Sequence, residues 1–232
     1  MTNTFLSHVH RGPFCIDGAT GTMIQKLDLE DAHFGGPDFK MLVDLLCFSL
    51  PDAVKDIHLA FLRVGAQAIE TNTFGASPLR LAEYDAARLD TSHFPANPYH
   101  LDLRTLDSAA LAYHLSRRAA ELAQEACRLY RHEAGYDGRD LFVLGAMGPS
   151  NHVVSATTAN LRRASFDAIA DNFHRQALGL IDGGADVLLF ETQQDILELK
   201  AGVFGVRRAL SEREKSLPIM GQVTVDQFGR MQ

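Results

Sequence analysis

The chain has 232 residues, of which 46% are hydrophobic and 22% are charged, an ordinary composition for a globular protein of one domain or two small ones. Its 22 basic and 29 acidic residues leave a net charge of −7, which argues against a surface that follows nucleic-acid phosphates. The sequence has no apolar run near the ~18 residues that a membrane span requires. We therefore expect a protein that works without nucleic acid or membrane.

Apolar runs and amphipathic stretches alternate along the chain. The runs are continuously apolar, as strands buried on both faces should be. The stretches between them have the periodicity and the ends of helices, such as Pro51 in a first turn and Gly65 after a last one. Residues 85–104, which are rich in Pro, Asn and Asp, predict a surface-loop insertion. In chain order the sequence predicts strand 13–16, helix 51–65, strand 66–69, helix 106–132, strand 141–144, helix 165–183, strand 187–190, helix 195–210 and strand 217–225.

Two of the predicted strands share one pattern. Gly65-Ala66 precedes Glu70-Thr71, and Gly184-Ala185 precedes Glu191-Thr192, with intervals that differ by two residues. Because side chains alternate along a strand, a difference of two preserves the face on which each glutamate lies. Repeated strand–helix units of this kind predict a parallel sheet, open or closed into a barrel.

Polar or glycine-rich segments follow the strands at the edge where parallel α/β proteins bind ligands. Asp17 and Glu191 are the sharpest pair, because a carboxylate that leaves a buried strand is costly unless a cation or a hydrogen-bond donor meets it. Alternatively, each caps a helix or ties down a loop. Gly18 and Gly21 lack the spacing of a phosphate-binding loop, although small residues let a ligand approach the backbone closely.

The three cysteines are odd in number and widely spaced, which argues against a disulfide framework and fits a reducing, cytoplasmic location. The N-terminus shows no secretory signal. Cys15 is expected to be a small buried core residue, and Cys127 to be inert in a helix. His8 and His10 form an HxH pair that precedes the first strand, so we expect a solvated segment there. His58 falls within a helix, where a surface or interface position is expected.

The strand ends taken together resemble the homocysteine S-methyltransferase family. The resemblance covers nearly all of the chain except residues 85–104. Residues 44–47 and 51–58 are similar in particular to the N-terminal homocysteine-binding module of cobalamin-dependent methionine synthases. The resemblance to the family rests on four motifs: DGATGT at 17–22, ETNTF at 70–74, GAMGP at 145–149, and GGAD at 183–186 leading to ET at 191–192.

This resemblance implies a (βα)8 TIM barrel in which three cysteine thiolates bind zinc, and the zinc holds the homocysteine sulfur as a thiolate. The thiolate attacks a methyl group from methylcobalamin or another donor, such as betaine or S-methylmethionine. Asp17 and Glu191 would bind the amino group of homocysteine. The backbone of Gly18, Ala19 and Thr20 would line the pocket, and the rim would be completed by Asn72 and Thr73.

The sequence departs from the family in its number of strand–helix units and in its cysteines. We count about five βα units, whereas a closed barrel needs eight, and the zinc cysteines of the family belong to the ends of later strands. Cys15, Cys47 and Cys127 do not occupy those positions, so we expect no metal ligand and no catalytic residue in this chain. Residues 1–232 are therefore predicted to form one homocysteine-binding domain, an incomplete barrel that is inactive alone.

Three origins fit such a chain: a fragment, a truncated gene product, or a piece that another chain completes. Further domains or a second chain would then carry the cobalamin, folate and zinc-cysteine parts. Two other classes stay open. One is a non-catalytic half-barrel that binds an amino acid or a partner, and the other is an unrelated open α/β enzyme.

Overall fold

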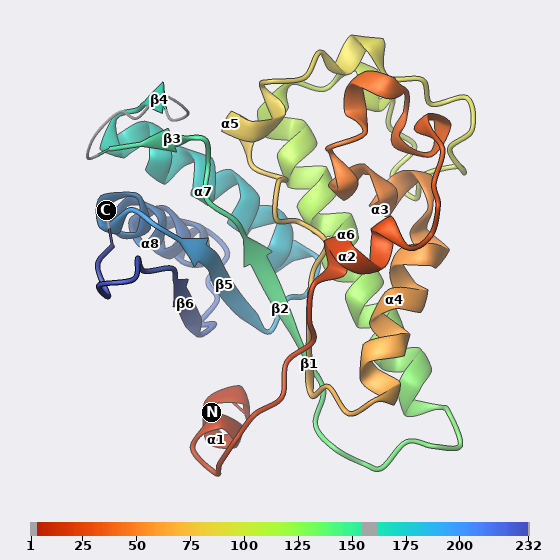
Figure 1. Ribbon diagram of the computed structural model, residues 1–232, viewed down its shortest axis with the longest axis vertical. Helices are drawn as coiled ribbons and strands as arrows, with labels where there is room; N and C mark the ends of the chain where they lie inside the picture. The colour runs from red at the N-terminus through yellow and green to blue at the C-terminus, as the bar shows by residue number, and fades with distance from the viewer. Residues whose placement is uncertain (1–3, 155–161, 232) are drawn as a thin grey trace.

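The computed structural model describes residues 4–154 and 162–231. Its centre is a parallel sheet whose four strands follow one another in chain order, β1-β2-β5-β6 (Figure 1). Each strand is joined to the next through at least one helix, as parallel pairing requires. The strands are β1 (Ala68–Glu70), β2 (Phe142–Met147), β5 (Val187–Gln193) and β6 (Ile219–Val223).

The first predicted strand, 13–16, is reduced to a single bridge between Ile16 and Ala68. Gln67 and Ala68 donate to the carbonyl of Cys15, and Asp17 donates to that of Ala68. Pro13 has no N–H to extend this pairing, so the segment runs beside β1 without forming a ladder. The predicted strand is therefore wrong in extent, although its direction and neighbour are those of a first barrel strand.

Four long helices pack in a row in chain order and cover one face of the sheet. The predicted caps are confirmed at two of them: the side chain of Ser165 accepts one backbone N–H of the following turn, and that of Asp195 accepts two. Gly205 lets two of these helices approach closely, because a Cβ at this position would overlap the carbonyl oxygen of Ala170. The four are α4 (Pro51–Arg63), α6 (Ser108–Arg131), α7 (Phe166–Asp182) and α8 (Ile196–Glu212).

The other face of the sheet packs on the N-terminal helix α1 (Thr4–Val9) through Phe5. His10 is exposed, as expected for a solvated segment, whereas His8 is half-buried against Phe14 and Phe142. Cys15 is exposed rather than in the core, because a single bridge leaves it uncovered. His58 is fully buried on α4 rather than at a surface, and this burial lowers the pKa of its imidazole to about 4.

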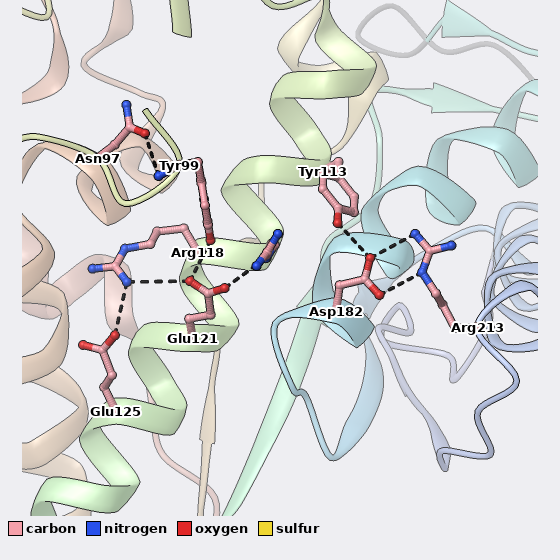
Figure 2. A network of polar contacts seen from close by, with 9 residues as sticks. Asn97, Tyr99, Tyr113, Arg118, Glu121, Glu125, Asp182 and Arg213 are labelled. Carbon is pink, nitrogen blue, oxygen red and sulfur yellow. Dashed lines mark hydrogen bonds and ion pairs between the residues drawn. The ribbon is translucent and has the colours of Figure 1, made fainter. Parts of the chain in front are cut away.

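Residues 85–104 pack against α6, although many of their side chains are exposed. They contain η4 (Ala86–Arg88), and η5 (Leu103–Thr105) begins within them. Leu89 and Leu103 are buried, and Tyr99 donates its hydroxyl to Glu121 of α6 at 2.7 Å (Figure 2). The segment therefore behaves as a loop that apolar side chains and a polar network hold in place.

A second polar contact in the same view joins three helical elements. Asp182 at the end of α7 accepts the hydroxyl proton of Tyr113 from α6 at 2.8 Å (Figure 2). It also receives two hydrogen bonds from Arg213, which follows α8, at 2.8 and 2.9 Å. These contacts lower the pKa of Asp182 against the effect of its burial.

The remaining elements are short. They are α2 (Thr20–Gln25), η1 (Asp31–Phe34), η2 (Pro37–Phe39), η3 (Val43–Leu45), α3 (Leu46–Ser49), α5 (Pro78–Leu81) and the small parallel pair β3 (His152–Val153) and β4 (Arg162–Arg163). In the described part of the chain, no helix combines the length and the apolar character needed to cross a membrane.

Candidate functional site

A cavity of about 590 Å³ lies at the carboxyl ends of β1 and β5. Asp17, Glu70 and Glu191 line it, and among the described residues no Lys, Arg or His does. Three acids that share a partly buried space without a basic residue form a site suited to a cationic group. All seven residues predicted for the site also line this cavity: Asp17, Gly18, Ala19, Thr20, Asn72, Thr73 and Glu191.

The carboxylate of Asp17 is held by the end of β1. Its two oxygens accept the backbone N–H of Glu70 at 3.1 and 3.0 Å. Burial, helped by the negative charges of Glu70 and Glu191, nevertheless raises the pKa of Asp17 to about 8. Asp17 thus ties down a loop, as the alternative interpretation had it, and also lines the cavity.

Glu70 is a cavity residue that the sequence argument did not single out. It stands two residues after Ala68, and Glu191 stands two after Leu189, both of which belong to the face of the sheet that packs on Phe5. The predicted equal orientation of the two glutamates is therefore confirmed, and this parity was the signal that could have identified Glu70. Burial and the charge of Glu191 raise the pKa of Glu70 to about 7, and burial raises that of Glu191.

Backbone amides that follow Asp17 also line the cavity. Gly18 and Ala19 precede α2, and their N–H groups meet no acceptor among the described residues. A Cβ at Gly18 would lie 3.5 Å from the Phe61 ring, an ordinary contact. The glycine is therefore not required by packing, and its small size leaves the backbone open to the cavity.

The side chains of Asn72 and Thr73 are turned to the protein itself. Asn72 donates to the carbonyl of Val43 at 2.8 Å. The Ala146 N–H donates to Thr71 Oγ1 at 3.0 Å, the two threonine hydroxyls are 2.6 Å apart, and Thr73 Oγ1 donates to the Ala146 carbonyl at 2.6 Å. This closed ring of hydrogen bonds fastens the end of β1 to β2.

The backbone turns at Thr192, so that both Glu191 and Thr192 line the cavity. Its φ of 56° lies in the left-handed region, which is unfavourable for a β-branched residue. The pairing of β5 with β6 is irregular between Phe190 and Gln193. Successive side chains of a regular strand point to opposite faces, whereas Glu191 and Thr192 both line the cavity. The strained turn therefore shapes this edge of the site.

The thiols do not form a zinc site. No group of three Cys, His, Asp or Glu side chains suited to a metal occurs in residues 4–154 and 162–231. Cys47 and Cys127 are buried in separate places, and burial raises the pKa of each to about 12. Cys47 and Cys127 belong to different core clusters and Cys15 is exposed, so the three thiols do not come together around one metal.

A parallel sheet ordered along the chain, covered by helices and carrying its cavity at the strand ends, places the protein in the α/β barrel class. Within that class, the chain belongs to the homocysteine S-methyltransferase family, which its sequence matches over residues 14–231.

Two curated relatives are methionine synthases. That of Mycobacterium tuberculosis (strain ATCC 25618 / H37Rv) is 34% identical over 215 residues, which are 93% of this chain and 15% of the relative. That of Mycobacterium leprae (strain TN) is 32% identical with the same coverage. The chain thus spans about 15% of the length of these relatives.

Solved structures of the homocysteine methyltransferase MmuM from Escherichia coli have the same fold. The metallated form matches with a TM-score of 0.69 and 20% identity, over 97% of this chain and 68% of that chain. The oxidised form matches with a TM-score of 0.67 and 21% identity, over 94% and 64%. The predicted fold class, a partial barrel of this family, agrees with these matches.

Proposed function

We propose that this chain binds homocysteine, as the amino-acid-binding part of a homocysteine S-methyltransferase. The observation that carries the proposal is a cavity that, in the described part of the chain, has three carboxylates and no basic residue, in a member of this family. Asp17 and Glu191 would bind the α-ammonium group. The free N–H groups of Gly18 and Ala19 would bind the α-carboxylate, so that different groups of the same cavity hold the two charged ends of the amino acid.

In this proposal, the residues of the rim hold the backbone of the site in place. Thr20 begins α2 beside the two amides. Asn72 and Thr73 keep the end of β1 against its neighbours through the hydrogen bonds described above. A direct contact of Asn72 or Thr73 with homocysteine stays a prediction.

Methylation would need more than the described residues provide. A thiol with an ordinary pKa near 8.5 is mostly protonated at neutral pH, and in the family zinc deprotonates it. Because the three thiols here do not fit zinc, the metal and a methyl donor such as methylcobalamin belong to the proposal as contributions from further domains or a second chain. The chain alone would then bind homocysteine without methylating it. Three free thiols suit a cytoplasmic location.

The test is isothermal titration calorimetry of L-homocysteine against the chain under reducing conditions. Asp17→Asn and Glu191→Gln should each weaken binding by about tenfold or more, since each removes a charge-assisted hydrogen bond. Glu83→Gln is the matched control, because Glu83 is exposed and contacts Asn151 outside the cavity. Unchanged affinity in both cavity variants would rule out this assignment.

A non-catalytic half-barrel remains a second candidate because β6 leaves one edge of the sheet uncovered. Gly221, Gln222 and Val223 are exposed, and an exposed strand edge is a template for pairing with another chain. Self-association that depends on this edge, combined with no binding of homocysteine, would favour this candidate. Sedimentation velocity of the wild type and of Val223→Lys, with the same titration, distinguishes the two.

A further inference from the structure

The cavity contains one carboxylate more than the proposed contact with an ammonium group uses. Glu70 lies between the other two acids in the order of the sheet, on β1 next to Asp17 and on the same face as Glu191. No donor among the described residues reaches the carboxylates of Glu70 and Glu191. An incoming cation would therefore meet acceptors whose hydrogen-bonding capacity is unused.

Within residues 4–154 and 162–231, the other groups that line the cavity carry no positive charge to balance these three acids. The segment before α2 contributes Asp17, β1 contributes Glu70 and β5 contributes Glu191. The described cavity residues of α2 and β6 are all uncharged. On α6, behind Asp17, the thiol of Cys127 stays protonated because burial raises its pKa to about 12. Three full negative charges without a cation are unfavourable in a partly buried space.

We propose that Glu70 is a third ligand of the substrate's α-ammonium group and that the cavity exchanges a proton for this ammonium on binding. The inference rests on the proposed function. In the empty cavity the three acids share a retained proton. When the ammonium enters, the O–H bond of the protonated carboxyl breaks, the proton leaves to solvent, and N–H···O bonds form to the carboxylates. The ammonium brings one positive charge to the three acids and one proton leaves them, so the net charge at the acids is conserved, while the α-carboxylate binds apart from them at the backbone N–H groups.

The pKa values of the cavity carboxyl groups agree with this exchange near neutral pH. Burial and the neighbouring acids raise the pKa of Asp17 to about 8 and that of Glu70 to about 7. Because the groups interact, the proton belongs to the set rather than to one residue. A cation that displaces it should bind more tightly as the pH rises, with a limiting slope of about tenfold in affinity per pH unit.

L-Methionine is the sharpest probe, because it has the ammonium and carboxylate of homocysteine but no thiol proton. Titrations at about pH 6.5, in two buffers of different ionisation enthalpy, give the number of protons released per ligand. We expect a release of about one proton per ligand at this pH. The release should fall as the pH rises above the pKa values of the carboxyl groups. L-Homocysteine, measured in parallel, should give the same release while its thiol stays protonated.

Glu70→Gln should reduce the proton release and make affinity less dependent on pH, while part of both effects stays with Asp17, whose pKa is raised mainly by burial. It should also weaken binding by about tenfold at pH 8 through the lost charged acceptor. Glu83→Gln should leave all three quantities unchanged. The buffer comparison on the wild type tests the exchange even if Glu70→Gln does not fold. Ligand binding without proton release, and unaffected by Glu70→Gln, would overturn this inference alone. No binding of either amino acid would overturn the proposed function with it.

Discussion

Thr73→Val tests the conclusion that this rim residue acts by fastening two strands. Thr73 is fully buried, and valine has nearly the same shape, so the change removes a hydroxyl without opening a cavity. Thr73 Oγ1 donates to the Ala146 carbonyl at 2.6 Å and lies 2.6 Å from Thr71 Oγ1. The substitution therefore breaks two of the three hydrogen bonds in the ring and leaves the Thr71 hydroxyl without an acceptor in it.

The expected cost follows from that count. Leaving buried polar groups without partners costs about 1–3 kcal/mol, and in a chain of this size each kcal/mol lowers the melting temperature by about 2–4 °C. Gln176 still donates to the Ala146 carbonyl, although at 3.5 Å, so part of the loss is compensated. We expect the melting temperature of Thr73→Val to fall by about 3–8 °C.

Melting followed by circular dichroism measures this shift, and Thr22→Val is the matched control. Thr22 lines the same cavity but is exposed, so its substitution should change stability by less than about 0.5 kcal/mol. Well below the melting temperature, Thr73→Val should change the affinity for homocysteine by less than about twofold, because its hydroxyl is engaged with β2. A large loss of affinity with unchanged melting would refute the fastening role and support direct contact.

Three further predictions concern the surroundings of the site. Gly148→Ala should destabilise the fold by about 1–3 kcal/mol in chemical denaturation, because a Cβ would lie 2.5 Å from the carbonyl oxygen of Phe74; an unchanged midpoint would contradict this. Burial raises the pKa of Glu198 from 4.5 to about 7, so its ionisation should lower stability as the pH rises between these values and no further above them. Melting of Glu198→Gln from pH 4 to 8 should show a smaller fall than the wild type. Tyr99→Phe, which loses the hydrogen bond to Glu121, should speed proteolytic cleavage within residues 85–104, and an equal cleavage rate would show that the bond does not hold the loop.

The sequence predicted the helices and central strands because local signals determine them. Continuous apolar runs marked β2 and β5, and the caps at Ser165 and Asp195 lie where they were expected. The segment 13–16 has the same apolar character but forms a single bridge to Ala68. Its extent depends on pairing with β1, a long-range interaction that apolar character alone does not specify.

For the site, the sequence predicted the edge of the sheet at which the cavity lies and most of the residues that line it. It did not predict which of these residues face the cavity and which bind the protein itself. Thr73 binds Ala146, whereas no donor in the described part of the chain reaches Glu70, and this difference depends on which face each side chain takes at the end of β1 and beyond it. The left-handed turn at Thr192 has no signal in its residue type, because threonine rarely adopts it. Such strain persists only where surrounding structure imposes it, and it is therefore visible only in the fold.

The excess of carboxylates links the stability of the fold to its proposed ligand. Asp17 and Glu70 have raised pKa values because the folded chain disfavours their charged forms. Their ionisation therefore opposes folding as the pH rises through neutrality. A ligand with an ammonium group relieves this cost, because it supplies the cation that the described residues do not. Ligand binding should therefore stabilise the chain more at pH 8 than at pH 6, which is the thermodynamic counterpart of the proposed proton exchange.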